Sequence, residues 1–141
     1  MKFDSLIHLL RKNGFRDTQP RRLVLEALHM MRGPASPYDI QKWIEKKHHL
    51  PISSVTVYRI AGLFMKLGLA HKHACGGGIV LCTHLNQPGL HGYLHCEDCG
   101  SSEEFCSTEL SKITKSQASR HGFKHPSSVL EIAGTCRSCS K

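Results

Sequence analysis

The chain has 141 residues, 40% of them hydrophobic, which is enough for one ordinary domain or two small ones. It has no apolar run long enough to span a membrane, and charges and His8 interrupt the apolar N-terminal stretch, unlike a signal peptide. We therefore expect a cytoplasmic protein with no membrane partner. Its seven cysteines would stay reduced, and an odd number disfavours a closed disulfide framework.

The formal charge of +8 is divided unevenly along the chain. Residues 1–83 contain 13 Lys/Arg and 5 Asp/Glu, a net of +8, whereas residues 84–141 contain 6 of each and are neutral. A basic half joined to a neutral half is typical of a nucleic-acid-binding domain followed by a second domain. The alternative left open by charge alone is a basic domain that has no nucleic-acid partner.

Apolar periodicity and capping residues predict four helices in the basic half. Asn13-Gly14 and Gly33-Pro34 break the pattern, and Ser36 followed by Pro37 is a strong helix start. The predicted helices cover residues 3–12, Pro20 to about 32, Ser36 to about 48, and Ser53 or Ser54 to about Leu67.

Two short strands follow the fourth helix, over residues 69–73 and 79–82, and Gly76-Gly77-Gly78 forms the turn between them. Helices followed by such a hairpin predict a winged helix-turn-helix domain over residues 1–83. Residues 84–92 are polar, with Pro88 and two glycines, and are the predicted hinge.

The neutral half, residues 93–141, predicts a small α+β unit. Its pattern indicates strands near 93–96, 102–105 and 129–133, with one helix over about 107–120. The hydrophobic content of this half is modest, so we expect a bound metal to support its fold.

The fourth helix is the expected recognition helix, because the second helix of a helix-turn-helix lies in the major groove. An aromatic ring such as Tyr58 can cover a thymine methyl group, and Arg59 can join a base edge to a phosphate. The alternative is that Tyr58 belongs to the core and Arg59 is merely solvated. The further DNA-contact candidates are Ser54 and Thr56 in this helix, and Arg16, Thr18, Arg21 and Arg22 near the second helix.

Two Cys-x-x-Cys pairs, Cys96 with Cys99 and Cys136 with Cys139, are the strongest motif of the chain. Two such turns brought together provide the four thiolates that structural zinc prefers, which predicts a four-cysteine zinc site. A redox role is the alternative, but a redox pair is typical of a strand-to-helix junction, and this segment has none.

Other residues that can bind metals lie between positions 71 and 106, and residue type alone does not select a site among them. They are His71, His73, Cys75, Cys82, His84, His91, His95, Glu104 and Cys106.

Five stretches spread over nearly the whole chain resemble the ferric uptake regulator family. Three begin at Gly14 (GFRDTQPRRLVL), Ser53 (SSVTVYR) and Leu67 (LGLAH), and the other two are the Cys-x-x-Cys pairs that begin at Cys96 and Cys136. The resemblance implies a homodimeric, metal-dependent transcriptional repressor with an N-terminal winged helix and a C-terminal α/β dimerisation domain. The helix entry here reads Thr-Gln-Pro-Arg instead of the more usual Thr-Pro-Gln-Arg.

Within that family, the sequence is more similar to the zinc uptake regulator branch. The branch pattern implies a regulatory zinc site at His71, Cys82, His91 and Glu104, and so two zinc ions per subunit. Where many members have a further metal-binding histidine near the last strand, this chain has Ser128, with His121 and His125 nearby.

The expected function is therefore a zinc-responsive repressor that binds double-stranded operator DNA as a homodimer. The alternatives are an iron-, manganese- or peroxide-sensing member of the same family. His95-x-Glu97 faintly resembles zinc deaminases, whose signature has Pro before the second Cys pair. Thr135 is at that position here, so we expect no enzyme and no catalytic residues.

Overall fold

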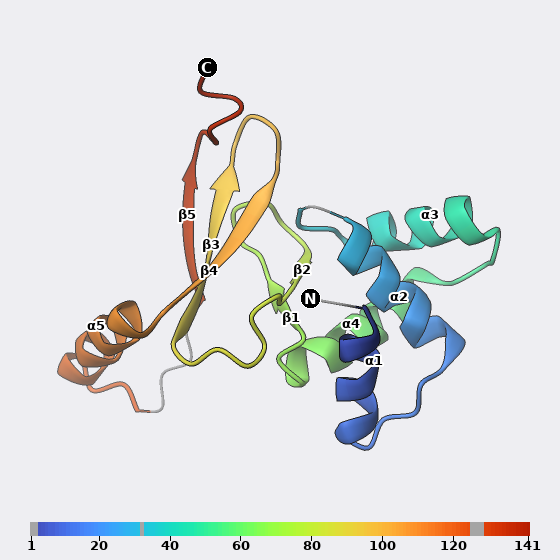
Figure 1. The fold of residues 1–141 in the computed structure, drawn as a ribbon, viewed down its shortest axis with the longest axis horizontal. Helices are drawn as coiled ribbons and strands as arrows, with labels where there is room; N and C mark the ends of the chain where they lie inside the picture. Colours follow the sequence, from blue (N-terminus) through green and yellow to red (C-terminus); the bar gives the residue numbers. More distant parts are fainter. Residues whose placement is uncertain (1–2, 32, 125–128) are drawn as a thin grey trace. The chain divides into compact units, whose positions relative to one another are not determined.

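The computed structural model describes residues 3–31, 33–124 and 129–141 (Figure 1). The chain divides into two compact units, Met1–Thr83 and His84–Lys141, and each is described by itself. In the described residues, no helix is both long and apolar enough to cross a membrane.

The first unit contains the four predicted helices, and each turns an apolar stripe toward a shared core. Leu6 and Leu10 in the first helix and Val24 and Leu25 in the second are completely buried. The helices are α1 (Phe3–Lys12), α2 (Gln19–Met30), α3 (Pro37–His48) and α4 (Ser54–Lys66).

Serine caps fix where two of these helices begin. The Ser36 hydroxyl accepts a hydrogen bond from the Asp39 backbone N–H at 3.1 Å, and the Asp39 carboxylate accepts one from the Ser36 N–H at 2.9 Å. This reciprocal pair satisfies two N–H groups at the start of α3. At α4, the Ser53 hydroxyl accepts from the Thr56 N–H at 3.1 Å, which decides between the two predicted starts.

The predicted wing is present as an antiparallel hairpin of β1 (Ala70–Lys72) and β2 (Ile79–Leu81), slightly shorter than expected. Ile79 also forms a bridge with Ala35, just before α3. Gly78 permits this approach, because its φ is +88° and a Cβ there would lie 2.5 Å from the Ala35 carbonyl carbon. The hairpin is therefore attached to the helical core.

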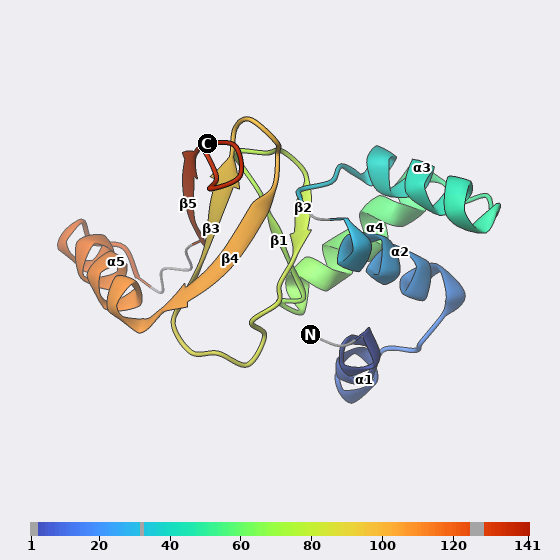
Figure 2. The same cartoon turned by 45° about the horizontal axis from the view of Figure 1, so that its top comes forward.

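The second unit is a three-stranded sheet in the order β4-β3-β5 with one helix (Figure 2). β3 pairs antiparallel with β4 and parallel with β5, so the predicted α+β class is confirmed. The first strand begins three residues earlier than predicted, because Leu90 is buried and pairs with Ser107. The elements are β3 (Leu90–Cys96), β4 (Ser102–Ser107), α5 (Thr108–Arg120) and β5 (Val129–Gly134).

One glycine of β3 is required by its neighbour across the sheet. Gly92 pairs with Phe105, and a Cβ on Gly92 would lie 2.2 Å from the Phe105 ring atom Cζ. The ring therefore covers the bare backbone of β3. This contact explains how a strand reaches into a segment whose glycines and proline predicted a hinge.

We expect Gly92→Ala to lower the free energy of unfolding by about 1–3 kcal/mol, because the added methyl group overpacks against Phe105. Thermal unfolding of the zinc-loaded protein measures this. Gly62→Ala is the matched control, since a Cβ on Gly62 meets no atom within 4 Å, and it should be neutral or stabilising. If Gly92→Ala lowered the free energy of unfolding equally in a Phe105→Leu variant, the explanation would be contradicted.

Candidate nucleic-acid interface and metal centres

The first turns of α4 expose the side chains that the sequence assigned to DNA. Tyr58 is 66% exposed, so the alternative that it belongs to the core is wrong. Ser54 and Arg59 are exposed as well, and Thr56 is half-buried. The opposite face of the same helix carries completely buried residues, including Val57, so α4 is fixed while its outer face stays open.

A groove of about 390 Å³ lies between the start of α2 and the outer face of α4. Two arginines, Arg21 and Arg59, and two hydroxyl residues, Thr18 and Thr56, contribute to its lining. Arginine and hydroxyl groups are the usual donors to DNA phosphates. The groove thus brings together residues that lie about forty positions apart in the sequence.

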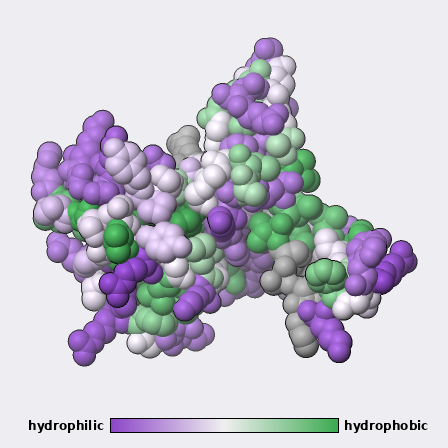
Figure 3. Space-filling model, turned by 180° about the vertical axis from the view of Figure 1, so that it is seen from behind, coloured by the Kyte–Doolittle hydropathy of each residue, from purple (hydrophilic) through white to green (hydrophobic). Residues whose placement is uncertain are grey.

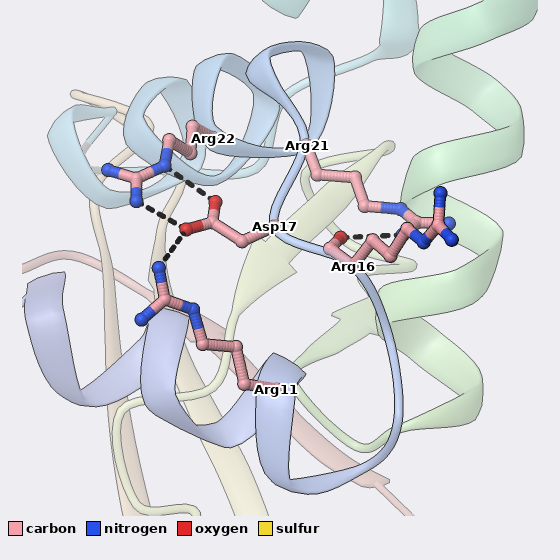
Figure 4. Close-up of polar contacts among 5 residues, drawn as sticks. All are labelled: Arg11, Arg16, Asp17, Arg21 and Arg22. Carbon is pink, nitrogen blue, oxygen red and sulfur yellow. Dashed lines mark hydrogen bonds and ion pairs between the residues drawn. The ribbon is translucent and has the colours of Figure 1, made fainter.

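Arg21 is held at this groove by the loop that precedes α2 (Figure 4). Its Nη1 donates to the Arg16 carbonyl oxygen at 2.6 Å, and its guanidinium carbon lies 5.7 Å from the centre of the Phe15 ring. Its neighbour Arg22 behaves differently, because it forms an ion pair with Asp17. The arginines near α2, which the sequence grouped together, therefore have different environments.

The wing hairpin brings His71 and Cys82 to one face. The Cys82 N–H donates to the Leu69 carbonyl at 2.8 Å, which places Cys82 opposite Leu69. Residues two apart on a strand share a face, so His71 lies on the same face as Leu69. It therefore also lies on the same face as Cys82, which is opposite Leu69. The Cys82 side chain is 1% exposed and His71 is half-buried. The hairpin can therefore supply one thiolate and one imidazole together.

The second unit pairs the other two predicted ligands. The His91 Nδ1 lies 2.9 Å from the Glu104 Oε1, across the β3–β4 pair. His84, which the sequence left unassigned, has its Nδ1 3.4 Å from the other carboxylate oxygen of Glu104. The Glu104 side chain is only 3% exposed. A buried carboxylate between imidazoles is a suitable environment for a divalent cation.

The four cysteines of the Cys-x-x-Cys pairs gather at one end of the sheet. Parallel pairing sets Cys96 opposite Gly134, so the turns after β3 and after β5 lie together. The four sulfur atoms are all within 4.8 Å of one another, and the Cys99 and Cys136 sulfurs are 3.8 Å apart. Sulfurs bound tetrahedrally to zinc at about 2.3 Å would be about 3.8 Å apart. The cluster therefore fits one zinc ion.

Hydrogen bonds within the cluster give its thiols different pKa values. Backbone N–H groups, first that of Cys136 at 3.3 Å, lower the pKa of Cys96 to about 6. The Ser101 hydroxyl lowers the pKa of Cys99. Interaction with the Cys136 and Cys99 sulfurs raises the pKa of Cys139 to about 12. One thiolate is thus present near neutral pH, and the last proton leaves only when a cation takes its place.

The model of the ferric uptake regulator family matches residues 12–133. This chain belongs to that family. Its members are metal-responsive transcription regulators, so this regulator binds DNA and metal.

Named relatives of this regulator include both iron and zinc regulators. The ferric uptake regulation protein of Cupriavidus metallidurans is 30% identical over 90% of this chain and 88% of its own. The zinc uptake regulation protein of Mycobacterium tuberculosis is 28% identical over 89% of this chain and 95% of its own. A solved zinc uptake regulator complexed with zinc and DNA is 25% identical, with a TM-score of 0.86 over 99% of this chain and 96% of that one.

Several residues that the sequence left open have defined positions in the regulator. Cys75 is exposed in the wing turn, and His121 is exposed at the end of α5. The His95 Nδ1 lies 3.0 Å from the Ser102 hydroxyl. His125 and Ser128, which bear on a third metal site, are outside the described residues.

We expect the zinc affinity of the four-cysteine cluster to fall as pH falls, because protons compete for the thiolates. Above about pH 6 the Cys96 thiolate is already formed, so zinc binding releases fewer than four protons. Below about pH 6 zinc must also displace the Cys96 proton, so the zinc affinity falls more steeply with pH. Competition with a chromophoric chelator between about pH 5 and pH 8 measures this slope. Cys106→Ser, outside the cluster, should leave the slope unchanged, and a constant slope through pH 6 would contradict the assignment.

Proposed function

We propose that this regulator is a zinc-responsive repressor that binds operator DNA and lowers transcription of zinc-uptake genes when zinc is sufficient. The observation that carries the proposal is the buried Cys82 thiol beside His71 on the wing hairpin. A thiolate with imidazole and carboxylate partners suits Zn²⁺ better than Fe²⁺ or Mn²⁺, whose sites favour nitrogen and oxygen ligands. The likeness to a zinc regulator solved with zinc and DNA supports the same conclusion.

The proposed regulatory site takes two donors from each unit, His71 and Cys82 from the first and His91 and Glu104 from the second. Such a site would restrict how the two units are oriented, and so set where α4 is presented to DNA. The four-cysteine cluster would hold a second zinc permanently and keep the sheet folded. In this scheme one zinc per subunit is structural and the other is the signal.

We also propose that the regulator is a homodimer formed through its second unit. α5 has no buried residue, and Leu94 and Ile132 are paired neighbours on the sheet that are 45% and 47% exposed. Figure 3 shows hydrophobic side chains gathered on this unit. Exposed apolar residues of this kind are typical of a protein interface. A dimer would present two copies of α4 to a palindromic operator.

Iron is the second candidate signal, because the Cupriavidus relative is a ferric uptake regulation protein. Peroxide sensing at Cys106 is disfavoured, since burial and the nearby Glu104 charge raise the pKa of this thiol and reduce its thiolate form. The decisive experiment selects a duplex from a random library with zinc-loaded protein. Binding to it is then titrated with buffered Zn²⁺, Fe²⁺ and Mn²⁺. Binding promoted by Fe²⁺ but not by low free Zn²⁺ would overturn the zinc assignment.

We expect Cys82→Ser to abolish zinc-dependent binding to the selected duplex while leaving a folded dimer, because only the regulatory site loses its thiolate. Fluorescence anisotropy and size-exclusion chromatography measure the two properties. Cys75→Ser removes an exposed thiol of the same hairpin and is the matched control. Normal zinc-dependent binding by Cys82→Ser would contradict the proposed switch.

Arg59→Ala should weaken binding to the selected duplex by about 1–3 kcal/mol if the guanidinium reads a base edge. The loss on mixed-sequence DNA should be smaller, because phosphate contacts carry no sequence information. Lys46→Ala removes the same charge from an exposed position of α3, outside the proposed dimer interface, and controls for net charge. Equal losses on both duplexes would assign Arg59 to a phosphate instead of a base.

A further inference from the structure

Asp17 is an acidic residue in the basic loop that precedes α2, next to Thr18 of the candidate DNA-binding groove. Its side chain is only 8% exposed, because two guanidinium groups cover it. Arg11 at the end of α1 donates to it at 2.6 Å. Arg22 in the first turns of α2 donates through both Nε and Nη2, the first at 2.5 Å. The carboxylate therefore joins the end of α1 to the start of α2.

The hydrogen bond from Arg22 is the main reason that the pKa of Asp17 lies below its usual range, and Arg11 lowers it further. Two-point arginine–carboxylate contacts are both stronger and more directional than single hydrogen bonds. The carboxylate consequently stays charged at neutral pH and holds both arginines in one geometry. Arg11 and Arg22 are 60% and 49% exposed, so their positive charge is still partly open to solvent.

The same short loop controls a different arginine on its other side. Figure 4 shows Asp17 with Arg11 and Arg22 on one side of the loop, and Arg16 with Arg21 on the other side, toward α4. Arg21 is held by the Arg16 carbonyl, the residue immediately before Asp17. Moving the backbone at Asp17 would therefore move the acceptor that orients Arg21.

We propose that Asp17 is a positioning residue for DNA binding: by anchoring the loop to Arg11 and Arg22, it aims Arg21 at the groove shared with Arg59. The inference rests on the proposed DNA-binding face and deepens it. In this proposal Arg11 and Arg22 stabilise the loop through Asp17, and Arg21 makes the contact with DNA. An arginine that is already oriented loses less side-chain entropy when it meets a phosphate, so its contact is stronger.

The competing explanation is that Asp17 opposes DNA binding by repelling phosphates and occupying two arginines. The two explanations predict opposite changes in DNA affinity for Asp17→Asn, which removes one negative charge from the protein. Positioning predicts that the affinity for DNA falls about tenfold, because the charged hydrogen bond from Arg21 to a phosphate is lost. Repulsion predicts that affinity rises as two arginines are released to phosphates.

The experiment measures anisotropy of zinc-loaded protein on a labelled mixed-sequence duplex of about three helical turns at several salt concentrations. Positioning predicts that the slope of log affinity against log salt becomes shallower by about one, since one phosphate contact is lost. Repulsion predicts a steeper slope. Glu45→Gln, at an exposed position of α3, makes the same change in charge and should not reduce affinity.

Two further variants keep the test valid if Asp17→Asn unfolds the first unit. Arg22→Lys preserves charge but removes the two-point contact, and it should also lower affinity and flatten the slope. Asp17→Glu should restore part of the wild-type affinity. If the wild type binds the duplex, and Asp17→Asn and Arg22→Lys bind it with unchanged or higher affinity, this inference alone is overturned. Failure of the wild type to bind any duplex with zinc would overturn the proposed function as well.

Discussion

Four thiols meet at the end of the second unit where β3 and β5 run parallel, and a zinc ion bound there would hold that end of the sheet together. The fully buried side chains of its described part are few, chiefly Leu90, Tyr93 and Cys96, and α5 contributes none. Parallel strands need a long crossover whose closure costs entropy, and a core this small offsets little of it. A structural zinc in zinc-finger peptides contributes about 10–16 kcal/mol of apparent binding free energy at neutral pH. A metal held this firmly would stabilise the fold and would be a poor sensor.

A sensor needs ligands whose occupation changes which state of the protein is favoured. The Cys82–His71 pair and the His91–Glu104 pair belong to different units of the chain, so neither can complete a four-ligand sphere alone. A ligand that moves an equilibrium from about 1:99 to 99:1 must prefer one state by about 10⁴-fold. A zinc ion that gains two more donor side chains in one state than in the other would have such a preference. The division of donors thus suits a switch, as the gathering of thiols suits a scaffold.

The sequence predicted these two groups of ligands to different degrees. The Cys-x-x-Cys pairs were visible from spacing, and helices were predictable because caps such as Ser36 and Ser53 are local signals. The early start of β3 was missed, because the contact between Gly92 and Phe105 is made across strands. The place of His84 beside Glu104 and the ion pairs of Asp17 could not be predicted for the same reason. Each depends on side chains brought together by tertiary structure.

The ion pairs of Asp17 also change what the charge of the first unit means. Residues 1–83 carry a net charge of +8, but net charge does not say which cations are aimed at DNA. Arg21 and Arg22 are adjacent in sequence, yet one is held at the groove beside α4 and the other is bound to a carboxylate. Because α-helical neighbours point about 100° apart, consecutive arginines can serve binding and support separately. The acidic residue that lowers the net charge is then part of what orders the charges that remain.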